Sequence, residues 1–149
     1  TLEDIKDQYT MDFIVNAMEK TNTAKQITFE IVESEGIESF TEVSNFIKKA
    51  KKLGCKIAID DFGTGYSNFE YIIKLDVDYI KIDGSLIKNI NSDNNLYLTV
   101  QTIVGFAKAL KIKTVAEFVH NEEVLNCVKN LDIDYSQGFF IDEPKELIL

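Results

Sequence analysis

Acidic side chains stand where several short apolar runs of the chain end. The residues that share this placement are Glu30, Glu33, Asp60, Asp61 and Glu117. A single carboxylate at such a point commonly caps the next helix or faces water. Several carboxylates brought into one cleft repel one another, and cations relieve that repulsion. Because hard oxygen ligands suit Mg²⁺, Mn²⁺ or Ca²⁺, these residues are candidates for a divalent metal site.

Asp60 and Asp61 are adjacent, and their geometry decides whether both can serve one site. In a regular strand, neighbouring side chains point to opposite faces of the sheet. At a strand end the chain turns, so we expect both carboxylates to reach the same metal ions. The glycines of Gly63-Thr64-Gly65 lack the spacing of a nucleotide-binding fingerprint, so they predict a strained loop rather than a phosphate cradle.

Alternating elements are expected to position these residues. Short runs rich in β-branched residues predict strands at 26–32, 56–60, 77–82, 113–116 and, more weakly, 136–141. Helical spacing predicts helices at 11–18, 40–53, after 67–70, 96–110 and 121–131. Capping boxes at 39–42 and 67–70 begin two of the helices, Gly54 ends one, and Asn121 caps the last. No short internal repeat is apparent.

Strands that alternate with helices indicate an α/β fold with a five-stranded parallel sheet. Right-handed crossovers place the carboxyl ends of all strands at one edge, which is where parallel sheets and barrels bind ligands. Lys81, Asp83 and Gln137 also stand at predicted strand ends. We therefore expect them at the same edge as the acidic residues.

Composition limits the possible functions. The chain has 149 residues, a length typical of one domain, and a net charge of −9, which disfavours a duplex DNA or RNA partner. It contains no apolar run of the roughly 18 residues that a membrane helix needs, and no signal peptide is visible, so we expect a cytoplasmic protein. Cys55 and Cys127 are expected to be reduced and buried, and with His120 they are too few for a zinc site.

The segment from Asp60 to Ser67 resembles, without a break, the central motif of EAL-type cyclic di-GMP phosphodiesterases. Further family signatures follow the same order along the chain, and the resemblance extends from Leu2 to Pro144. These signatures are Phe29–Glu33, Lys81–Asp83, Val115–Glu117 and Gln137–Phe139. The resemblance implies a (β/α)₈ barrel of the TIM type with one reversed strand. It also implies hydrolysis of cyclic di-GMP to linear pGpG with two Mg²⁺ or Mn²⁺ ions.

The resemblance implies a set of metal ligands. Glu30 is similar to the metal-binding glutamate of the family's fourth strand, and Glu117 to another metal-binding glutamate that also takes part in catalysis. Asp60 is similar to the ligand that bridges the two ions. Asp61 is similar to a ligand of the second ion.

The resemblance also implies roles outside the metal site. Lys81 matches a catalytic lysine near the attacking water and the substrate, and Gln137 matches a residue that contacts the substrate. Glu33 resembles the glutamate that steadies the loop after Asp61. That loop, residues 61–67, and the helix after it form a dimer contact in many relatives, so a homodimer is expected.

The sequence lacks two signatures of the family pattern. Neither the Glu-Ala-Leu signature nor the metal-binding Asn of the next strand is present, and a barrel of about 250 residues would have three further strands. We therefore expect residues 1–149 to represent the fourth to eighth strands as one domain fragment, inactive or weakly active alone. The strand at 26–32 would then have an exposed edge, giving dimerisation or a gap.

A second departure lies beside the Glu117 ligand. The family usually has Glu-Gly-Val-Glu where this chain has Glu117-Phe118-Val119-His120. A neutral imidazole can bind a metal ion but supplies no negative charge. His120 is therefore either a weaker neighbour of the second metal or a residue that points to solvent.

The sequence is compatible with three functions. The first is a metal-dependent phosphodiesterase. The second is a non-catalytic signalling domain that binds cyclic di-GMP or a protein, which Phe118 and His120 favour. The third is a phosphoacceptor receiver domain, which the order of residues disfavours: a receiver has its acidic pair after the first strand and its lysine after the fifth, whereas Lys81 follows the third predicted strand.

Overall fold

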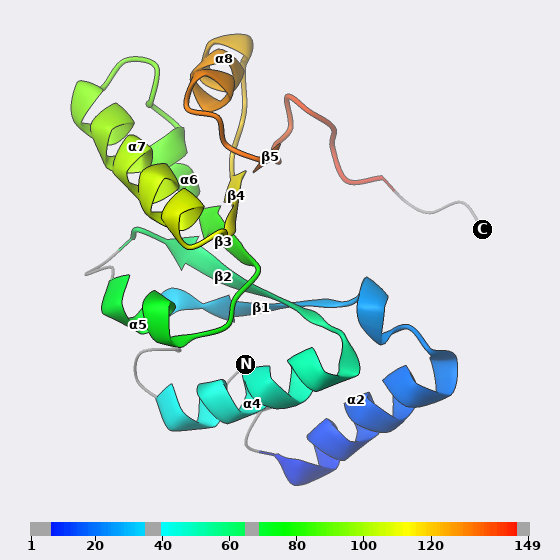
Figure 1. Ribbon diagram of the computed structural model, residues 1–149. Helices are drawn as coiled ribbons and strands as arrows, with labels where there is room; N and C mark the ends of the chain where they lie inside the picture. The colour runs from blue at the N-terminus through cyan, green and yellow to red at the C-terminus, as the bar shows by residue number, and fades with distance from the viewer. Residues whose placement is uncertain (1–6, 35–39, 65–68, 146–149) are drawn as a thin grey trace. The chain divides into compact units, whose positions relative to one another are not determined.

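Figure 1 shows the fold in a computed structural model, which describes residues 7–34, 40–64 and 69–145. The helices of these parts are α2 (Gln8–Thr21), the short 3₁₀ helix η1 (Ala24–Gln26), α4 (Phe40–Leu53), α5 (Phe69–Lys74), α6 (Gly84–Ile87), α7 (Asn94–Ala109) and α8 (Glu122–Asn130). The strands are β1 (Thr28–Val32), β2 (Lys56–Phe62), β3 (Tyr79–Ile82), β4 (Lys113–Ala116) and β5 (Tyr135–Ser136). None of these helices has both the length and the apolar character that crossing a membrane requires.

The five strands form one sheet in the order β1-β2-β3-β4-β5. β1 pairs with β2 in parallel, and β4 pairs with β5 in parallel. In β2, the consecutive side chains of Ile57, Ala58 and Ile59 are all buried, which is typical of a parallel strand covered on both faces. The predicted α/β fold with a five-stranded parallel sheet is confirmed.

The chain divides into two compact units, and the first comprises residues 1–60 and 65–79. Its described part contains the helices α2, α4 and α5 together with β1 and most of β2. One face of α4 is buried through Val43, Phe46, Ile47 and Ala50, which recur at helical spacing. The ring of Phe46 meets that of Phe29 in β1 edge to face, with 5.1 Å between the ring centroids. This packing fixes α4 against the strand that carries Glu30.

The second unit comprises residues 61–64 and 80–149. In it α7 packs against both α6 and β4 (Figure 1), and the buried face of α7 consists of Val100, Ile103, Val104 and Ala107. Asn121 caps α8 as predicted, because its Oδ1 accepts a hydrogen bond of 2.8 Å from the N–H of Val124. The segments that carry Lys81, Glu117 and Gln137 all belong to this unit.

Two strands differ from their predicted bounds. β3 begins at Tyr79 rather than at residue 77, because the Asp78 side chain takes a capping role described below. β5 covers only residues 135–136 instead of 136–141. Gly138, with φ 151°, ends the extended chain, and the N–H groups of Ile141 and Asp142 turn back to its carbonyl. β1 begins at Thr28, two residues after the predicted start.

Helix ends also differ in ways that capping explains. α2 is longer than predicted, because the Asp7 carboxylate accepts the N–H of Thr10 at 3.0 Å and Asn22 ends the helix with φ 54°. α6 was not predicted; it is one short turn whose start is capped by Asp83 through the N–H of Ser85. The capping boxes proposed at 39–42 and 67–70 depend on Ser39 and Ser67, which lie outside the described residues.

The two cysteines differ in burial. Cys55 is buried as predicted, with its Sγ 3.5 Å from the Sδ of Met18, and burial raises the pKa of its thiol. Cys127 is only half-buried, so the expectation that both would be buried is wrong for this residue. Both are free thiols.

One five-residue pattern occurs twice in the chain, so the expectation of no short internal repeat is wrong. In each copy an aspartate carboxylate accepts a backbone N–H from the start of the preceding strand, an arrangement called a carboxylate clamp below. The segments Leu75–Tyr79 and Leu131–Tyr135 have the same pattern, Leu-Asp-(Val/Ile)-Asp-Tyr. Asp78 accepts the N–H of Ile57 at 2.9 Å, and Asp134 accepts the N–H of Thr114 at the same distance. Each clamp therefore joins the start of one strand to the segment just before the next.

Lysines complete both clamps. Lys56 and Lys51 donate to Asp78 at 2.9 and 2.8 Å, while Lys113 donates to Asp134. Burial by itself would raise the pKa of each carboxyl group. The lysine and backbone hydrogen bonds outweigh it and hold the pKa of Asp78 and of Asp134 below the usual range.

The lowered pKa values predict an acid-sensitive stability. A carboxyl group with a lowered pKa in the folded state contributes stability that is present above its unfolded pKa, about 3.9. That contribution is lost as the pH falls through the lower, folded pKa. We expect Asp134→Asn to reduce the free energy of unfolding at pH 7 by about 1 kcal/mol. Below pH 4 the free energy of unfolding should decrease less in this variant than in the unaltered protein. Urea unfolding at pH 7 and at pH 3 measures both effects.

Asp132 offers a matched control two residues earlier in the same repeat. Its side chain is 88% exposed and pairs with Lys108 at the surface. We expect Asp132→Asn to change stability by less than about 0.5 kcal/mol. Equal unfolding curves for Asp134→Asn and the unaltered protein at pH 7 would show that the clamp contributes nothing.

Candidate metal centre

Asp60 and Asp61 lie next to each other near the end of β2, and both are half-buried. Asp61 has φ 56°, the left-handed conformation that aspartate tolerates better than most residues. This conformation interrupts the alternation of side chains that a regular strand would impose. The carboxylates of the two neighbours can therefore serve one site, as the sequence predicted.

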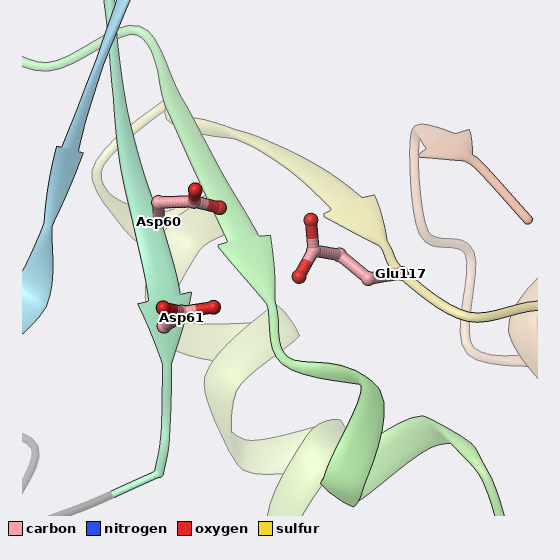
Figure 2. A group of neighbouring side chains, drawn as sticks. All are labelled: Asp60, Asp61 and Glu117. Carbon is pink, nitrogen blue, oxygen red and sulfur yellow. The ribbon is translucent and has the colours of Figure 1, made fainter.

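Glu117 completes a group of three carboxylates (Figure 2). Asp60, Asp61 and Glu117 each offer one carboxylate oxygen, and these oxygens lie within 4.8 Å of one another. Figure 2 shows the two aspartates on β2 and Glu117 just after the end of β4, with its carboxylate directed toward them. Asp60 belongs to the first unit and Asp61 to the second. The two are consecutive residues of β2, so the strand connects Asp60 directly to Asp61.

Hydrogen bonds hold Glu117 from its backbone and from its side chain. Its N–H donates to the carbonyl of Ile82 at 3.2 Å, which ties the residue to the end of β3. Its Oε1 accepts from Lys81 Nζ at 2.9 Å and from Gln137 Nε2 at 2.8 Å. Three neighbouring strand ends thus place one carboxylate group.

The ion pair of Lys81 and Glu117 is largely removed from water. The Lys81 side chain is 10% exposed and the Glu117 side chain 15%. In such surroundings a positive charge beside the carboxylates offsets part of their mutual repulsion. A carboxylate has about four lone-pair positions, so two donors on Glu117 leave capacity for a cation.

The donor set of the group fits a hard divalent cation. All three ligands are carboxylate oxygens, and half-burial of each residue lets a cation enter from solvent. Oxygen donors without sulfur or imidazole favour Mg²⁺, Mn²⁺ or Ca²⁺ over zinc. The group is therefore a candidate metal centre of the predicted kind.

Glu30 and Glu33 lie in the first unit, on and just after β1. In the parallel register Glu30 is opposite Ala58 and Val32 is opposite Asp60, so Glu30 and Asp60 share one face of the strand pair. Glu33 is only 5% exposed. The ligand role of Glu30 and the loop-steadying role of Glu33 stay predictions. Part of the loop at issue, residues 65–67, lies outside the described residues.

His120 is exposed and is not one of the three clustered ligands. Its Nδ1 lies 3.2 Å from the carbonyl of Phe118, and its Nε2 lies 3.1 Å from Nδ2 of Asn121. Both ring nitrogens therefore face polar groups of neighbouring residues in the chain. A role for His120 near a second metal stays a prediction.

Sequence reasoning missed the aromatic surroundings of Glu117. Phe118 has φ 55° and is 51% exposed, and Phe139 is 70% exposed. With His120 and Gln137 they line a pocket. The one available signal was the unusual Phe118 itself, where the family pattern has a glycine that adopts such a φ freely.

Comparison with known proteins gives a family match along most of the chain. The family model described as EAL domain matches residues 1–144. The chain is 42% identical over 125 residues to "Cyclic di-GMP phosphodiesterase PdeF" of Escherichia coli (strain K12), covering 84% of this chain and 17% of that protein. It is 38% identical over 144 residues to "Cyclic di-GMP phosphodiesterase PdeA" of Borreliella burgdorferi, covering 96% of this chain and 22% of that protein.

Solved structures give the same result for the fold. "PaMucR Phosphodiesterase, c-di-GMP complex" superposes with a TM-score of 0.89 at 27% identity, covering 97% of this chain and 59% of that one. The Xanthomonas citri FimX EAL domain, solved in complex with c-diGMP, superposes with a TM-score of 0.91 at 20% identity, covering 98% and 58%. These likenesses confirm the predicted part of a TIM-type barrel. The chain spans about a fifth of the curated relatives' length.

Proposed function

Because the chain belongs to the EAL domain family, we propose that it is part of a phosphodiesterase that hydrolyses cyclic di-GMP to linear pGpG. The observation that carries this proposal is the group of carboxylate oxygens from Asp60, Asp61 and Glu117 within 4.8 Å of one another. Lys81 beside Glu117 supports it. We propose further that residues 1–149 are the fourth to eighth strand-and-helix units of one barrel domain.

The proposed ligands of two Mg²⁺ or Mn²⁺ ions are Glu30, Asp60, Asp61 and Glu117. When bound, such ions lower the pKa of a water molecule and neutralise charge on the phosphate. Asp60 and Asp61 suit a shared site because the left-handed Asp61 frees them from strict alternation. Glu30 suits it because it shares a face with Asp60 in the β1–β2 register.

The other residues position the reactants. In hydrolysis the oxygen of a water molecule forms a bond to one phosphorus atom, and the bond from that phosphorus to a ribose 3′ oxygen breaks. A proton from the water is transferred to the released 3′ oxygen. Lys81 carries a positive charge beside Glu117, where it can orient the water and offset charge on the phosphate. Gln137 holds the same carboxylate oxygen through its Nε2, and this position supports the proposal that it contacts the substrate.

A homodimer and a cytoplasmic location are also part of the proposal. The loop from Asp61 to Ser67 and the helix after it would form a homodimer contact, with Glu33 steadying the loop. Glu33 suits this role because it is buried just after β1. Cytoplasmic location would match the use of a dinucleotide second messenger.

A non-catalytic role in binding cyclic di-GMP or a protein is the alternative. The loop Phe118–His120 favours it, because the expected acidic residue is replaced by an imidazole whose two nitrogens face a carbonyl and an amide. The clustered carboxylates and Lys81 favour catalysis. A receiver domain is excluded, since the chain matches the EAL domain model over residues 1–144.

A metal titration with a turnover assay separates catalysis from binding alone. We expect the full-length protein containing this chain to form pGpG only with added Mg²⁺ or Mn²⁺, and to stop when EDTA removes them. Chromatography of the products measures both. Binding of cyclic di-GMP without turnover at saturating metal would support the alternative instead.

Residues 1–149 alone form the second arm of this assay. We expect little or no hydrolysis from them, because the described residues cluster three carboxylate ligands, fewer than two ions with several oxygen ligands each require. Turnover at the rate of the full-length protein would contradict this expectation.

A further inference from the structure

The backbone reverses its hydrogen-bonding direction directly after Glu117. The N–H of Glu117 donates to the carbonyl of Ile82 in β3 at 3.2 Å. The N–H of Val119 donates at 3.0 Å to the carbonyl of Gln137, which follows β5 on the other side of β4. In a regular strand, N–H groups two residues apart point to the same neighbouring strand. Phe118 lies between them with φ 55°, and this left-handed conformation produces the reversal.

The reversal affects the carboxylate of Glu117 through Gln137. The N–H of Gln137 donates to the carbonyl of Ala116 at 2.9 Å, and its carbonyl accepts the N–H of Val119. The backbone of Gln137 is therefore bound to the chain just before and just after Glu117. Its Nε2 then donates to Oε1 of Glu117 at 2.8 Å. A different conformation at Phe118 would displace Val119 from Gln137, so the orientation of the carboxylate depends on this φ.

The strand β2 ends in the same way as β4. Each strand begins with a lysine, and the proposed metal ligand four positions later is followed at once by a left-handed residue. These residues are Asp61, with φ 56°, and Phe118, with φ 55°. Aspartate tolerates the left-handed conformation, whereas a bulky side chain in it is an outlier. The conformation of Phe118 therefore depends on its neighbours in a way that the conformation of Asp61 does not.

Gly84, the first residue of α6, is the neighbour that makes room for Phe118. A Cβ on Gly84 would lie 2.7 Å from the Cβ of Phe118 and 3.4 Å from its Cγ, and the first distance is shorter than real Cβ contacts. Gly84 is helical and has no positive φ, so its own backbone does not require glycine. Lys88, which ends α6, holds the ring from the same side, with its Nζ 5.8 Å from the ring centroid.

Resting on the proposed function, we infer that Gly84 and Phe118 are a coupled pair of positioning residues for Glu117. The missing side chain at Gly84 leaves space for the left-handed Phe118. The left-handed Phe118 in turn sets the bond between Val119 and Gln137, which directs the carboxylate of Glu117 toward the cation. Neither member of the pair belongs to the clustered carboxylates. One added methyl group at Gly84 should nevertheless lower the affinity for metal.

Binding of Mn²⁺ to the full-length protein without substrate tests this inference independently of turnover. The electron paramagnetic resonance signal of free Mn²⁺ gives the affinity. Gly84→Ala should weaken Mn²⁺ binding about 10-fold, the lower end of the loss seen when a residue that supports a metal ligand is changed. Glu117→Gln should weaken it at least as much, which identifies the centre. Gly105→Ala is the matched control, because an added Cβ there meets nothing within 4 Å, and it should leave the affinity unchanged.

Substitutions of Phe118 separate the Cβ contact from loss of the ring. Phe118→Gly has no Cβ and adopts a φ of 55° freely, so it should keep Mn²⁺ affinity and restore it in the presence of Gly84→Ala. Phe118→Ala also removes the ring but keeps the Cβ, so it should not rescue Gly84→Ala. Phe118→Val should weaken Mn²⁺ binding with Gly84 intact, because a β-branched residue disfavours the left-handed conformation. This variant tests the inference even if Gly84→Ala does not fold.

Hydrogen–deuterium exchange follows the path from Gly84 to the carboxylate. In Gly84→Ala the amides of Glu117 and Val119 should exchange faster than in the unaltered protein, because their hydrogen bonds depend on Phe118. The amide of Thr114 in the same strand is an internal reference, since it donates to the Asp134 carboxylate at 2.9 Å. Its exchange should not change.

The outcomes separate this inference from the proposed function. A protein that hydrolyses cyclic di-GMP, but whose Gly84→Ala variant binds Mn²⁺ as tightly as the unaltered form, keeps the function and loses the coupled pair. A protein that shows the loss and its selective rescue by Phe118→Gly, but forms no pGpG, keeps the pair and loses the function. Equal rescue by Phe118→Ala, or unchanged Mn²⁺ affinity in Phe118→Val, also overturns the inference. Absence of Mn²⁺ binding by the unaltered protein overturns both.

Discussion

Glu117→Gln is expected to lower the kcat of cyclic di-GMP hydrolysis by about 10²–10³-fold, the loss that follows removal of one well-placed charged or polar group. Glutamine has the shape of glutamate and keeps an oxygen to accept from Lys81, which lies 2.9 Å from Oε1. It removes the negative charge that would bind the cation. Steady-state kinetics over a range of Mg²⁺ and Mn²⁺ concentrations measures both kcat and metal dependence.

Asp61→Asn provides an independent test of the same centre. Asparagine also tolerates the left-handed φ of 56°, so the backbone at the end of β2 should be kept while the charge is lost. We expect a loss similar to that of Glu117→Gln, with binding of pGpG in EDTA retained by both variants. Asp132→Asn, at an exposed site paired with Lys108, should leave kcat unchanged. Full activity in both site variants would remove the carboxylate group from the mechanism.

Gly138→Ala is expected to destabilise the protein by about 3 kcal/mol, near the upper end for added atoms in a packed site. A Cβ at this position would lie 2.2 Å from the carbonyl oxygen and 2.4 Å from the nitrogen of Val119. Its φ of 151° is also one that residues with a side chain rarely adopt. Val119 is held by hydrogen bonds to the Gln137 carbonyl and from the Phe140 N–H, so its backbone cannot move aside without breaking them.

The effect of Gly138→Ala should reach the site as well as the stability. Gln137, which holds Glu117, is the preceding residue, so we expect weaker pGpG binding even where the variant stays folded. Gly105→Ala is the contrasting control. An added Cβ there meets nothing within 4 Å on α7, and the change should stabilise the helix by about 0.5–1 kcal/mol. Urea unfolding of the two variants compares them, and similar stability changes for both would contradict this account.

The sequence determined the order of elements and the edge at which the polar residues gather. Short apolar runs predicted four strands near their observed places, while the weaker fifth prediction shares only Ser136 with β5. The alternation with helices predicted the parallel sheet. Local signals are enough here, because strand and helix periods are properties of neighbouring residues. Strand bounds were least accurate at β5, where Gly138 ends the extended chain after Ser136. A distant contact also shifts a bound at β3, because Asp78 accepts the N–H of Ile57.

The candidate site residues could also be proposed from sequence, since Asp60, Asp61, Lys81 and Glu117 stand at the ends of predicted strands. The tertiary structure decided how they combine. It set the left-handed turn at Asp61, and it brought Lys81 and Gln137 to the same oxygen of Glu117 from two other strands. It also joined Phe118 to Phe139, 21 positions later, as walls of one pocket. These relations depend on contacts between residues far apart in the chain, which no local pattern encodes.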